Sequence, residues 1–531
     1  MRIVFVAIGC EQLGISLLSA LAKQKGHDVS LAFSLALFDD LMHVSIPALG
    51  RFFSDRKIIF ATIKKNQPDV IVFSPASGSY RWMLEVAAEA KKICPHSRVI
   101  FGGPHVSAVP ELVISQPAVD YVCIGEGDIA FLKMLEALEK EDFFSPIENT
   151  WYKNSRGQII KGPQVGFIQD LDSLPMFDKP LWEDYFNFSD HYMTMATRGC
   201  PFRCTFCFNN YYANLPQGEK GQYMRYRSVD HFMHELRWAM KRYRVKRFDF
   251  FDDIFTYDKK WLKNFLDQYK RDIKRPFEIF SHLVHLDEAT MKMLGEAGCF
   301  SVELGIQTLD DAYKKRVLKR FDSHEKLIQV IRWSKQCGVR VRADHMLGLP
   351  TEPIEAQEAA RQFYVENTPY RIHTYWVKFF PGTELQKQAL DMGVLTKKDI
   401  EKLNSGHDVF CIKHSETITD PQRLRNYQVY QLIFRLITYM PARIKRLIKP
   451  RLFRFCPTGL VVFLTFWVDL SIGLVLREAH HYIYLKFYFF HMYCLLRTKV
   501  GLKRIPRMRH LNPETDLSFQ NNCPSQLLSG Q

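Results

Sequence analysis

Apolar and polar positions follow two alternating patterns along the first 145 residues. Short β-branched runs such as Ile3–Ile8 and Val70–Phe73 are continuously apolar, which is typical of strands buried on both faces. Between such runs, stretches such as Leu13–Gln24 repeat leucine at helical spacing and end at turn residues. Strand, loop and helix repeated in this order predict a doubly wound, Rossmann-like α/β domain with a parallel sheet over residues 1–145.

Two of the predicted strands in this first part run directly into glycine. They are the strands over Val99–Phe101 and Tyr121–Ile124. The carboxyl ends of parallel strands share one edge of a doubly wound sheet, where ligands bind, and glycine lets a ligand approach the backbone closely. We therefore expect a ligand at this edge, although turn formation alone is the simpler alternative. The residues concerned are Gly102, Gly103, Gly125, Glu126 and Gly127.

Residues 146–190 carry scattered glycine and proline without sustained periodicity, which predicts a linker. From residue 191 to residue 390, short apolar runs alternate again with amphipathic stretches. This pattern predicts a partial or full TIM-type (β/α) barrel, whose chemistry lies at the carboxyl ends of its strands. The expected strands are Met193–Thr197, Phe248–Phe251, Phe277–Phe280, Ser301–Leu304, Arg340–Asp344 and Thr374–Phe379.

The charge of the chain is concentrated in its last part. The 531 residues carry a net charge of +15, and residues 441–510 contain 14 Lys and Arg but only Asp469 and Glu478 as acids. Residues 391–531 therefore form a basic, apolar region, which its periodicity predicts to be helical. Because the cations border apolar runs and not a polar groove, we do not expect nucleic acid as a partner.

One segment of this region approaches the length of a membrane span. Thr458–Leu476 has 19 residues and no Lys or Arg, but Asp469 near its centre would cost about 2.5–3.5 kcal/mol to insert. Two interpretations of residues 441–510 stay open. One is a monotopic helical hairpin that docks on an anionic membrane, and the other is a buried helical cap over the barrel mouth. The aromatic residues suited to an interfacial position are Trp467, Tyr482, Tyr484 and Tyr488.

Three of the 12 cysteines are clustered, whereas most of the others are single. Cys200, Cys204 and Cys207 follow a predicted strand with the spacing Cys-x3-Cys-x2-Cys, so their thiolates converge on one metal centre. A closed zinc site needs a fourth ligand, which the nearby sequence does not offer. Three thiolates suit a 4Fe–4S cluster with one open iron, and a zinc knuckle is the alternative. So few cysteines indicate a reducing compartment.

The cysteine loop resembles the signature of radical S-adenosylmethionine enzymes, in which an aromatic residue, here Phe206, directly precedes the third cysteine. Later segments resemble, in the same order, the family's strands that contact methionine, ribose and adenine, and a late segment common in its cobalamin-dependent branch. The resemblance places Phe206 and Leu349 near the adenine. The segments are Phe251–Phe255, Glu303–Thr308, Met346–Glu352 and Phe380–Leu385.

Four polar residues acquire expected roles from this resemblance. Asp252 or Asp253 would receive the methionine ammonium, because a carboxylate is the natural partner of a cation. An N-cap or a surface position is the alternative for this pair. Glu303 and Gln307 would contact the ribose, and an internal salt bridge with Arg342 is the alternative for Glu303.

The glycine-rich edge of the first domain resembles the cobalamin-binding domain that precedes the barrel in one branch of this family. The match covers Gly102–His105 and Val119–Gly127. Many such domains carry a cobalt-ligating histidine after the first strand, but Gly9–Gly14 contains none. The resemblance therefore implies cobalamin bound without a protein histidine ligand, or a degenerate domain that has lost the cofactor. We expect Cys10 to be a buried thiol at the end of a strand.

These resemblances together imply an enzyme that uses a 4Fe–4S cluster to cleave S-adenosylmethionine to a 5′-deoxyadenosyl radical. The expected outcome is cobalamin-dependent methyl transfer to an unactivated carbon of a lipid-like or other hydrophobic substrate. The alternatives are an oxidative cyclase or ring-rearranging enzyme and a non-catalytic iron–sulfur electron carrier. We also expect a flavodoxin- or ferredoxin-type electron donor and a cytoplasmic location, with peripheral contact to the inner face of the membrane. The sequence indicates no individual catalytic residue.

Overall fold

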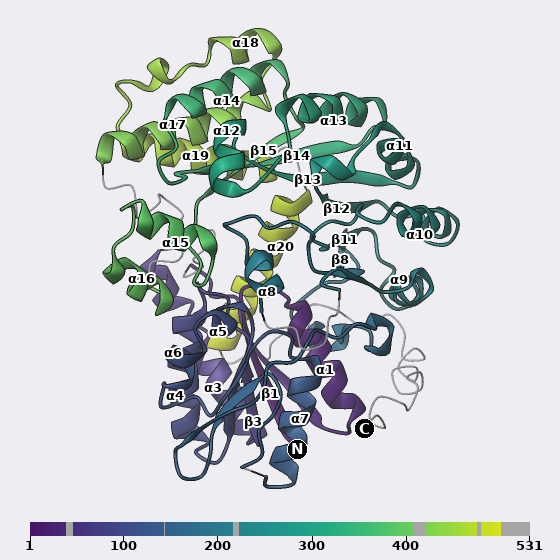
Figure 1. Cartoon of the computed structure of the whole chain (residues 1–531), viewed down its shortest axis with the longest axis vertical. Helices are drawn as coiled ribbons and strands as arrows, with labels where there is room; N and C mark the ends of the chain where they lie inside the picture. The colour runs from purple at the N-terminus through teal and green to yellow at the C-terminus, as the bar shows by residue number, and fades with distance from the viewer. Residues whose placement is uncertain (39–45, 143, 216–221, 408–419, 475–478, 501–531) are drawn as a thin grey trace.

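The strands assemble into two large sheets, one in the N-terminal domain and one in the domain that follows it (Figure 1). The computed structural model describes residues 1–38, 46–142, 144–215, 222–407, 420–474 and 479–500. Helices pack around both sheets, and the C-terminal region is helical. The α/β fold class expected from the sequence is confirmed, with the doubly wound sheet preceding the barrel.

The first sheet has the strand order β2-β1-β3-β4-β5-β6-β7. Its first five strands run parallel in the order of a doubly wound sheet, with the topological switch point between β1 and β3. The last two strands pair antiparallel and extend the sheet into the segment predicted as a linker. The strands are β1 (Arg2–Ile8), β2 (Asp28–Ser34), β3 (Val70–Phe73), β4 (Arg98–Phe101), β5 (Tyr121–Cys123), β6 (Thr150–Lys153) and β7 (Ile159–Lys161).

Helices cover both faces of the first sheet, because its parallel strands are apolar on both faces. Phe5 points into a core that includes Ile15 and Phe131 from two helices, whereas its neighbour Val4 points into the opposite core with Met83. The helices of this domain are α1 (Leu13–Gln24), α2 (Pro47–Phe52), α3 (Arg56–Asn66), α4 (Tyr80–Ile93), α5 (Pro104–Ala108), α6 (Pro110–Ile114) and α7 (Asp128–Glu139).

The second sheet has the order β15-β14-β13-β12-β11-β8, and all its neighbouring strands are parallel. In the described part of the chain β8 and β15 do not pair with each other, so the six strands form a partial barrel. Val302, Leu304 and Ile306 are buried against the outer helices, and the alternate positions face the barrel interior. The strands are β8 (Tyr192–Thr194), β11 (Phe248–Phe250), β12 (Phe277–Ser281), β13 (Cys299–Gln307), β14 (Arg340–Leu347) and β15 (Arg371–Trp376).

Five helices cover the outside of the barrel, and side-chain caps define where several of them begin. Ser228, Asp258 and Asp287 each accept a backbone N–H in the first turn of the following helix. These helices are α9 (Val229–Tyr243), α10 (Lys259–Asp272), α11 (Glu288–Glu296), α13 (His324–Gln336) and α14 (Glu355–Glu366).

Short elements connect the main strands and helices. Two of them, β9 (Thr197–Arg198) and α8 (Phe208–Ala213), lie directly before and after the cysteine loop. β9 pairs antiparallel with β10 (Arg225–Tyr226). The other short elements are η1 (Leu171–Ser173), η2 (Lys179–Trp182), η3 (Leu283–His285), α12 (Asp311–Tyr313), η4 (Lys314–Leu318) and η5 (Pro450–Phe453).

The C-terminal region contains the expected helices, two of which cover the barrel next to its last strand. α17 packs on β15 and α14, and α19 packs on α17. None of the described helices is long and apolar enough to cross a membrane. The helices are α15 (Glu384–Asp391), α16 (Lys397–Asn404), α17 (Pro421–Ile437), α18 (Ala442–Leu447), α19 (Thr458–Leu474) and α20 (Ala479–Lys499).

α20 extends from the barrel toward the N-terminal domain (Figure 1). Phe487 stacks on Phe186 with ring centroids 4.7 Å apart, and the Tyr488 hydroxyl accepts a hydrogen bond from the backbone N–H of Phe38 (2.5 Å). One side of α20 therefore packs inside the molecule, whereas Phe489 and Tyr493 of the same helix are 56% and 50% exposed. The side chains of Tyr482 and Tyr484 lie outside the described residues.

Candidate active site

A cavity of about 410 Å³ lies between the two domains. One wall comes from the carboxyl edge of the first sheet, and the other comes from β9, the start of the cysteine loop and the end of β11. The structure thus brings the glycine-rich edge of the N-terminal domain to the cysteine side of the barrel. The lining includes every residue predicted at that edge, namely Gly102, Gly103, Gly125, Glu126 and Gly127, and also Gly199 and Asp253.

Gly103 forms part of the cavity wall in a conformation that favours glycine. Its φ is +88°, and an added Cβ would lie 2.8 Å from the Ser74 hydroxyl oxygen. Backbone without side chains is therefore presented to the cavity here, at the edge of a doubly wound sheet where a large planar cofactor can rest. This wall fits the cobalamin implied by the sequence.

No histidine is among the residues of the described chain that line this cavity. His105 follows the glycine pair, but its side chain is fully buried against the Ser77 hydroxyl (3.0 Å) and the ring of Tyr80. Burial lowers the pKa of His105 to about 4. Cobalamin in this cavity would therefore have no protein histidine ligand from the lining. Cys10 is exposed and outside the lining, so the expectation of a buried thiol was wrong: the chain turns outward after Ile8.

Ion pairs connect the two walls of the cavity. Arg225 on β10 binds both carboxylate oxygens of Glu126, at 2.8 and 2.9 Å. Arg198 on β9 binds Asp128 at 2.6 Å and lies 3.1 Å from Glu126. Glu126 therefore connects the domains through arginine, in addition to lining the cavity. We call these four residues the interdomain clamp. The sequence indicated Glu126 only as part of the ligand edge and did not indicate the other three residues, because their pairing depends on how the domains dock.

The three clustered cysteines lie on the loop between β9 and α8. Burial raises the pKa of Cys200 to about 12 and that of Cys207 to about 11, and the neighbouring thiols contribute to both shifts. Burial also raises the pKa of Cys204, which the nearby Arg320 opposes. Each thiol therefore lies within electrostatic reach of the others. Cys204 is buried and the other two cysteines are partly buried, and such a group of three thiols fits an iron–sulfur cluster, because metal binding supplies the charge that makes thiolates stable there.

The structure separates the roles of Asp252 and Asp253. Asp252 Oδ1 accepts hydrogen bonds from the backbone N–H groups of Ala196 (2.9 Å) and Thr197 (2.5 Å) and from the Thr197 hydroxyl (2.7 Å). Asp252 therefore holds the chain just before the cysteine loop. Asp253 lines the cavity and accepts a hydrogen bond from Asn209 (2.7 Å), and burial raises its pKa to about 6.

The residues expected near adenine and ribose lie at the carboxyl ends of β13 and β14. Phe206 packs in one apolar cluster with Leu349, which joins the cysteine loop to the segment after β14. Gln307 ends β13 with φ +67°, and its side chain lies over Gly305. The structure thus gathers these residues at the barrel end that carries the cysteines.

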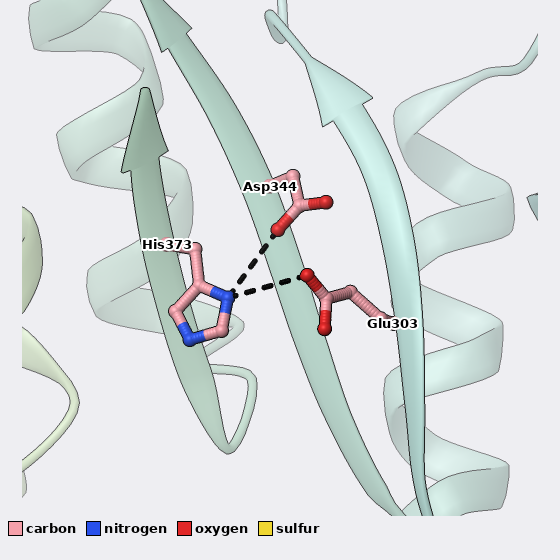
Figure 2. Close-up of side chains that lie close together, drawn as sticks. All are labelled: Glu303, Asp344 and His373. Carbon is pink, nitrogen blue, oxygen red and sulfur yellow. Dashed lines mark ion pairs between the residues drawn. The ribbon is translucent and has the colours of Figure 1, made fainter. Parts of the chain in front are cut away.

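Glu303 forms the internal salt bridge that the sequence offered as its alternative role. Arg342 Nη2 lies 2.6 Å from Glu303 Oε2 and 3.1 Å from Glu278. The other Glu303 oxygen faces His373, whose Nδ1 is 3.5 Å from it and 3.4 Å from Asp344 Oδ1. Figure 2 shows these three side chains pointing toward one another from β13, β14 and β15.

This group of Glu303, Asp344 and His373 lies in the barrel interior. Burial and Glu303 raise the pKa of Asp344 to about 7. Burial lowers the pKa of His373, but the two carboxylates outweigh burial and leave it raised. The group therefore holds a proton near neutral pH. Asp344 and His373 were missed in the sequence, where the only signal was polar residues at alternate positions of otherwise apolar strands.

Comparison with protein families agrees with both halves of this site. The B12 binding domain family matches residues 6–135, and the Radical SAM superfamily matches residues 194–363. The chain belongs to the cobalamin-binding-domain radical S-adenosylmethionine enzymes. Its cofactors are a 4Fe–4S cluster, S-adenosylmethionine and cobalamin, as the sequence predicted. The non-catalytic electron carrier considered as an alternative is thereby not supported.

Individual relatives cover most of this radical S-adenosylmethionine enzyme. It is 27% identical to the uncharacterized methyltransferase PH0819 of Pyrococcus horikoshii over 76% of this chain and 83% of that protein. It is 22% identical to cytidylyl-2-hydroxyethylphosphonate methyltransferase of Streptomyces wedmorensis over 73% of this chain and 79% of that protein. The structure of the enzyme OxsB with aqua-cobalamin and S-adenosylmethionine bound has the same fold, with a TM-score of 0.61 and 13% identity over 93% of this chain and 84% of that one.

Proposed function

We propose that this enzyme transfers a methyl group by way of cobalamin to an unactivated carbon of a hydrophobic, lipid-like substrate. The observation that carries the proposal is the single cavity whose walls are the cobalamin edge and the start of the cysteine loop. Two cofactors bound on these walls face each other across one space. Two of the relatives named above, from Pyrococcus horikoshii and Streptomyces wedmorensis, are named as methyltransferases, which supports the same reaction class.

The roles of the chain follow from where its residues lie. Cys200, Cys204 and Cys207 would hold the cluster, while the wall containing Gly103 would hold cobalamin. When bound, the cluster, S-adenosylmethionine and cobalamin supply the electron, the radical and the methyl group. The protein positions these groups across the cavity and keeps water from them. The interdomain clamp holds the two walls at a constant separation.

Asp253 is the residue we assign to the methionine ammonium. It faces the cavity beside the cysteine loop, whereas Asp252 is occupied by backbone donors. Desolvation raises the pKa of Asp253 and so disfavours its ionised form. An ammonium group bound beside it would stabilise the ionised carboxylate, because the two opposite charges then form a pair. Phe206 and Leu349 would contact the adenine, and Gln307 would contact the ribose.

A hydrophobic substrate is supported by the composition of the cavity wall. Apolar side chains from α1 and α7 contribute much of the lining. The group of Glu303, Asp344 and His373 in the barrel interior would bind and orient a polar end of the substrate, since it presents an exchangeable proton. The apolar residues are Leu13, Leu17, Leu18, Phe131 and Met134.

The reaction is tested with anaerobically reconstituted, cobalamin-loaded protein, dithionite as the electron donor, S-adenosylmethionine carrying a deuterated methyl group, and a lipid extract from the source cells. We expect 5′-deoxyadenosine and a lipid whose mass increases by a deuterated methyl group. The Cys207→Ala variant should lose iron and form no 5′-deoxyadenosine. The Cys10→Ala variant is the matched control, because Cys10 is exposed and outside the cavity. Deoxyadenosine without methyl transfer would instead indicate a ring-forming enzyme, and zinc in place of iron would refute the proposal.

A further inference from the structure

Exposed cations and exposed large apolar side chains are concentrated on three consecutive elements, α18, η5 and α19, whose combined surface we treat as one unit. We call it the basic–aromatic face. Phe455 is 90% exposed and Leu447 is 70% exposed, which is unusual for such side chains. Its apolar members are Leu447, Leu452, Phe455, Leu460, Phe463, Phe466 and Trp467, and its exposed cations are Arg443, Arg446, Lys449, Arg451 and Arg454.

α19 turns its aromatic side outward. Val461 and Thr465 are buried on the side that packs on α17. Phe463 and Trp467 lie on the opposite side and are 54% and 46% exposed. An ordinary surface helix presents its polar side to water, so this orientation indicates a partner that is itself apolar.

The loop that carries Phe455 is held in place by the rest of the protein. Arg425 on α17 donates hydrogen bonds to the backbone carbonyl oxygens of Phe453 (2.7 Å), Arg454 (2.7 Å) and Cys456 (2.9 Å). These three hydrogen bonds from the Arg425 guanidinium fix the backbone on both sides of Phe455. The exposed position of the Phe455 ring is therefore set by the folded structure of this loop.

The charge of this face has one sign. Residues 441–468 contain six Lys and Arg and no acid. The first acid, Asp469, forms an ion pair with Arg435 and so does not offset these cations. An anionic partner surface is thus complementary to the face.

We propose that the basic–aromatic face docks the enzyme on the surface of an anionic membrane. The cations contact lipid headgroups, and Phe455, Phe463 and Trp467 enter the boundary between headgroups and acyl chains. α19 lies in the plane of the membrane. In this position Asp469 keeps its ion pair with Arg435 of the protein and does not enter the acyl chains unpaired. This docking does not depend on the reaction of the enzyme, and it gives a lipid-like substrate a short path to the protein.

The test is cosedimentation of the full-length protein with vesicles made of equal parts phosphatidylglycerol and phosphatidylcholine, compared with pure phosphatidylcholine vesicles. We expect binding to the anionic vesicles that falls with added salt. The charge variant Arg443→Glu/Arg446→Glu/Arg451→Glu should bind at least roughly a hundredfold more weakly than wild type, since each cation near an anionic surface contributes about 1 kcal/mol. Its matched control, Lys64→Glu/Lys65→Glu/Arg332→Glu, makes the same charge change at exposed positions elsewhere and should bind nearly as wild type.

A second pair of variants tests the apolar contribution. Phe455→Ser/Phe463→Ser/Trp467→Ser should lose most of the binding, whereas Phe321→Ser, which changes a ring that is 74% exposed outside the face, should keep it. Trp467 fluorescence should also shift to shorter wavelength with anionic vesicles. Equal binding by the face variants and their controls would overturn the proposal. So would self-association through this face without vesicles, which the sedimentation velocity of the protein alone reveals. Methyl-transfer assays in detergent are independent of these outcomes.

Discussion

Gly103 is the single position at which backbone conformation shapes the cavity most directly. Gly103→Ala places a methyl group at φ +88° and 2.8 Å from the Ser74 hydroxyl oxygen. We expect the free energy of unfolding to fall by about 1–3 kcal/mol and cobalamin retention to fall with it. Urea unfolding and the visible spectrum of the loaded protein measure the two effects.

Gly26→Ala provides the comparison for this variant. Gly26 has a similar φ of +82°, but an added Cβ there meets no atom within 4 Å. It should cost about 1 kcal/mol and leave cobalamin binding unchanged. Equal loss of cobalamin from both variants would show that general destabilisation, and not the cavity wall, controls cofactor retention.

The group of Glu303, Asp344 and His373 makes stability depend on pH. Asp344 has a pKa of about 7 in the folded protein against an ordinary value of 3.8, so the folded state holds a proton that the unfolded chain releases. The contribution of Asp344 to the free energy of unfolding should therefore fall as pH rises from about 4 to 7. The raised pKa of His373 acts in the same direction at higher pH.

Asp344→Asn removes this proton without changing the shape of the side chain. At pH 8 the variant should be more stable than wild type by on the order of 4 kcal/mol, and near pH 3, where Asp344 is protonated in both the folded and the unfolded state, the two should be equal. Urea unfolding at both pH values measures this difference. The exposed Asp184→Asn variant should follow wild type at both. If Asp344→Asn tracks wild type as well, the proton is not held at Asp344.

At the level of single residues, the sequence indicated positions better than roles. The cysteines and strand-end glycines were found because spacing and backbone freedom are properties of local sequence. Asp252 and Asp253 are neighbours, so only the structure shows that one binds backbone and the other faces the cavity. Glu303 was assigned to ribose or to Arg342, and the structure gives the pair with Arg342.

β9 is held both by its pairing with β10 and by the Asp252 side chain, which makes Asp252 a sensitive connection to the cysteine loop. Asp252→Ala removes three hydrogen bonds to Ala196 and Thr197, leaving buried donors without an acceptor. We expect a loss of about 1–3 kcal/mol in the free energy of unfolding and less iron per chain after reconstitution.

Asp252→Asn keeps an oxygen acceptor in the same place and is the control for this element. It should retain most of the iron, because a carbonyl oxygen accepts the same N–H groups. Its stability should also rise relative to wild type at high pH, since burial raises the pKa of Asp252 to about 7. Iron loss equal to that of the alanine variant would argue for a direct role of the carboxylate charge.

At the level of elements, periodicity predicted the long ones and missed the short ones. All six barrel strands were expected, because continuous apolar runs between amphipathic helices are a strong pattern. β6 and β7 have four and three residues and continue the first sheet by antiparallel pairing with β5. So short a run has no periodicity to detect, and the segment was therefore predicted as a linker.

α20 contributes to the stability of the whole molecule because it packs on the N-terminal domain and the segment before the barrel. Phe487→Ala removes a ring that is 7% exposed and stacked on Phe186, and should cost about 3–5 kcal/mol. Phe489→Ala changes a ring that is 56% exposed two positions away and should stay within about 0.5 kcal/mol of wild type. Thermal unfolding of both variants tests this, and a similar cost for each would mean that α20 is not packed as described.

The arrangement of the domains was the part that the sequence left out. The interdomain clamp joins carboxylates and arginines about seventy to a hundred residues apart, and such pairing depends on docking and not on local pattern. Likewise, the sequence showed the basic and apolar residues of the C-terminal region. It did not show that α20 is packed inside while α19 turns its aromatic side outward.

The interdomain clamp is shielded from water, since the side chains of Arg225 and Asp128 are only 4% and 7% exposed. Dissolved ions screen contacts between exposed charges far more than contacts between shielded ones. A moderate salt wash should therefore reverse the proposed membrane docking while leaving the two walls of the cavity, and hence the rate of S-adenosylmethionine cleavage, unchanged.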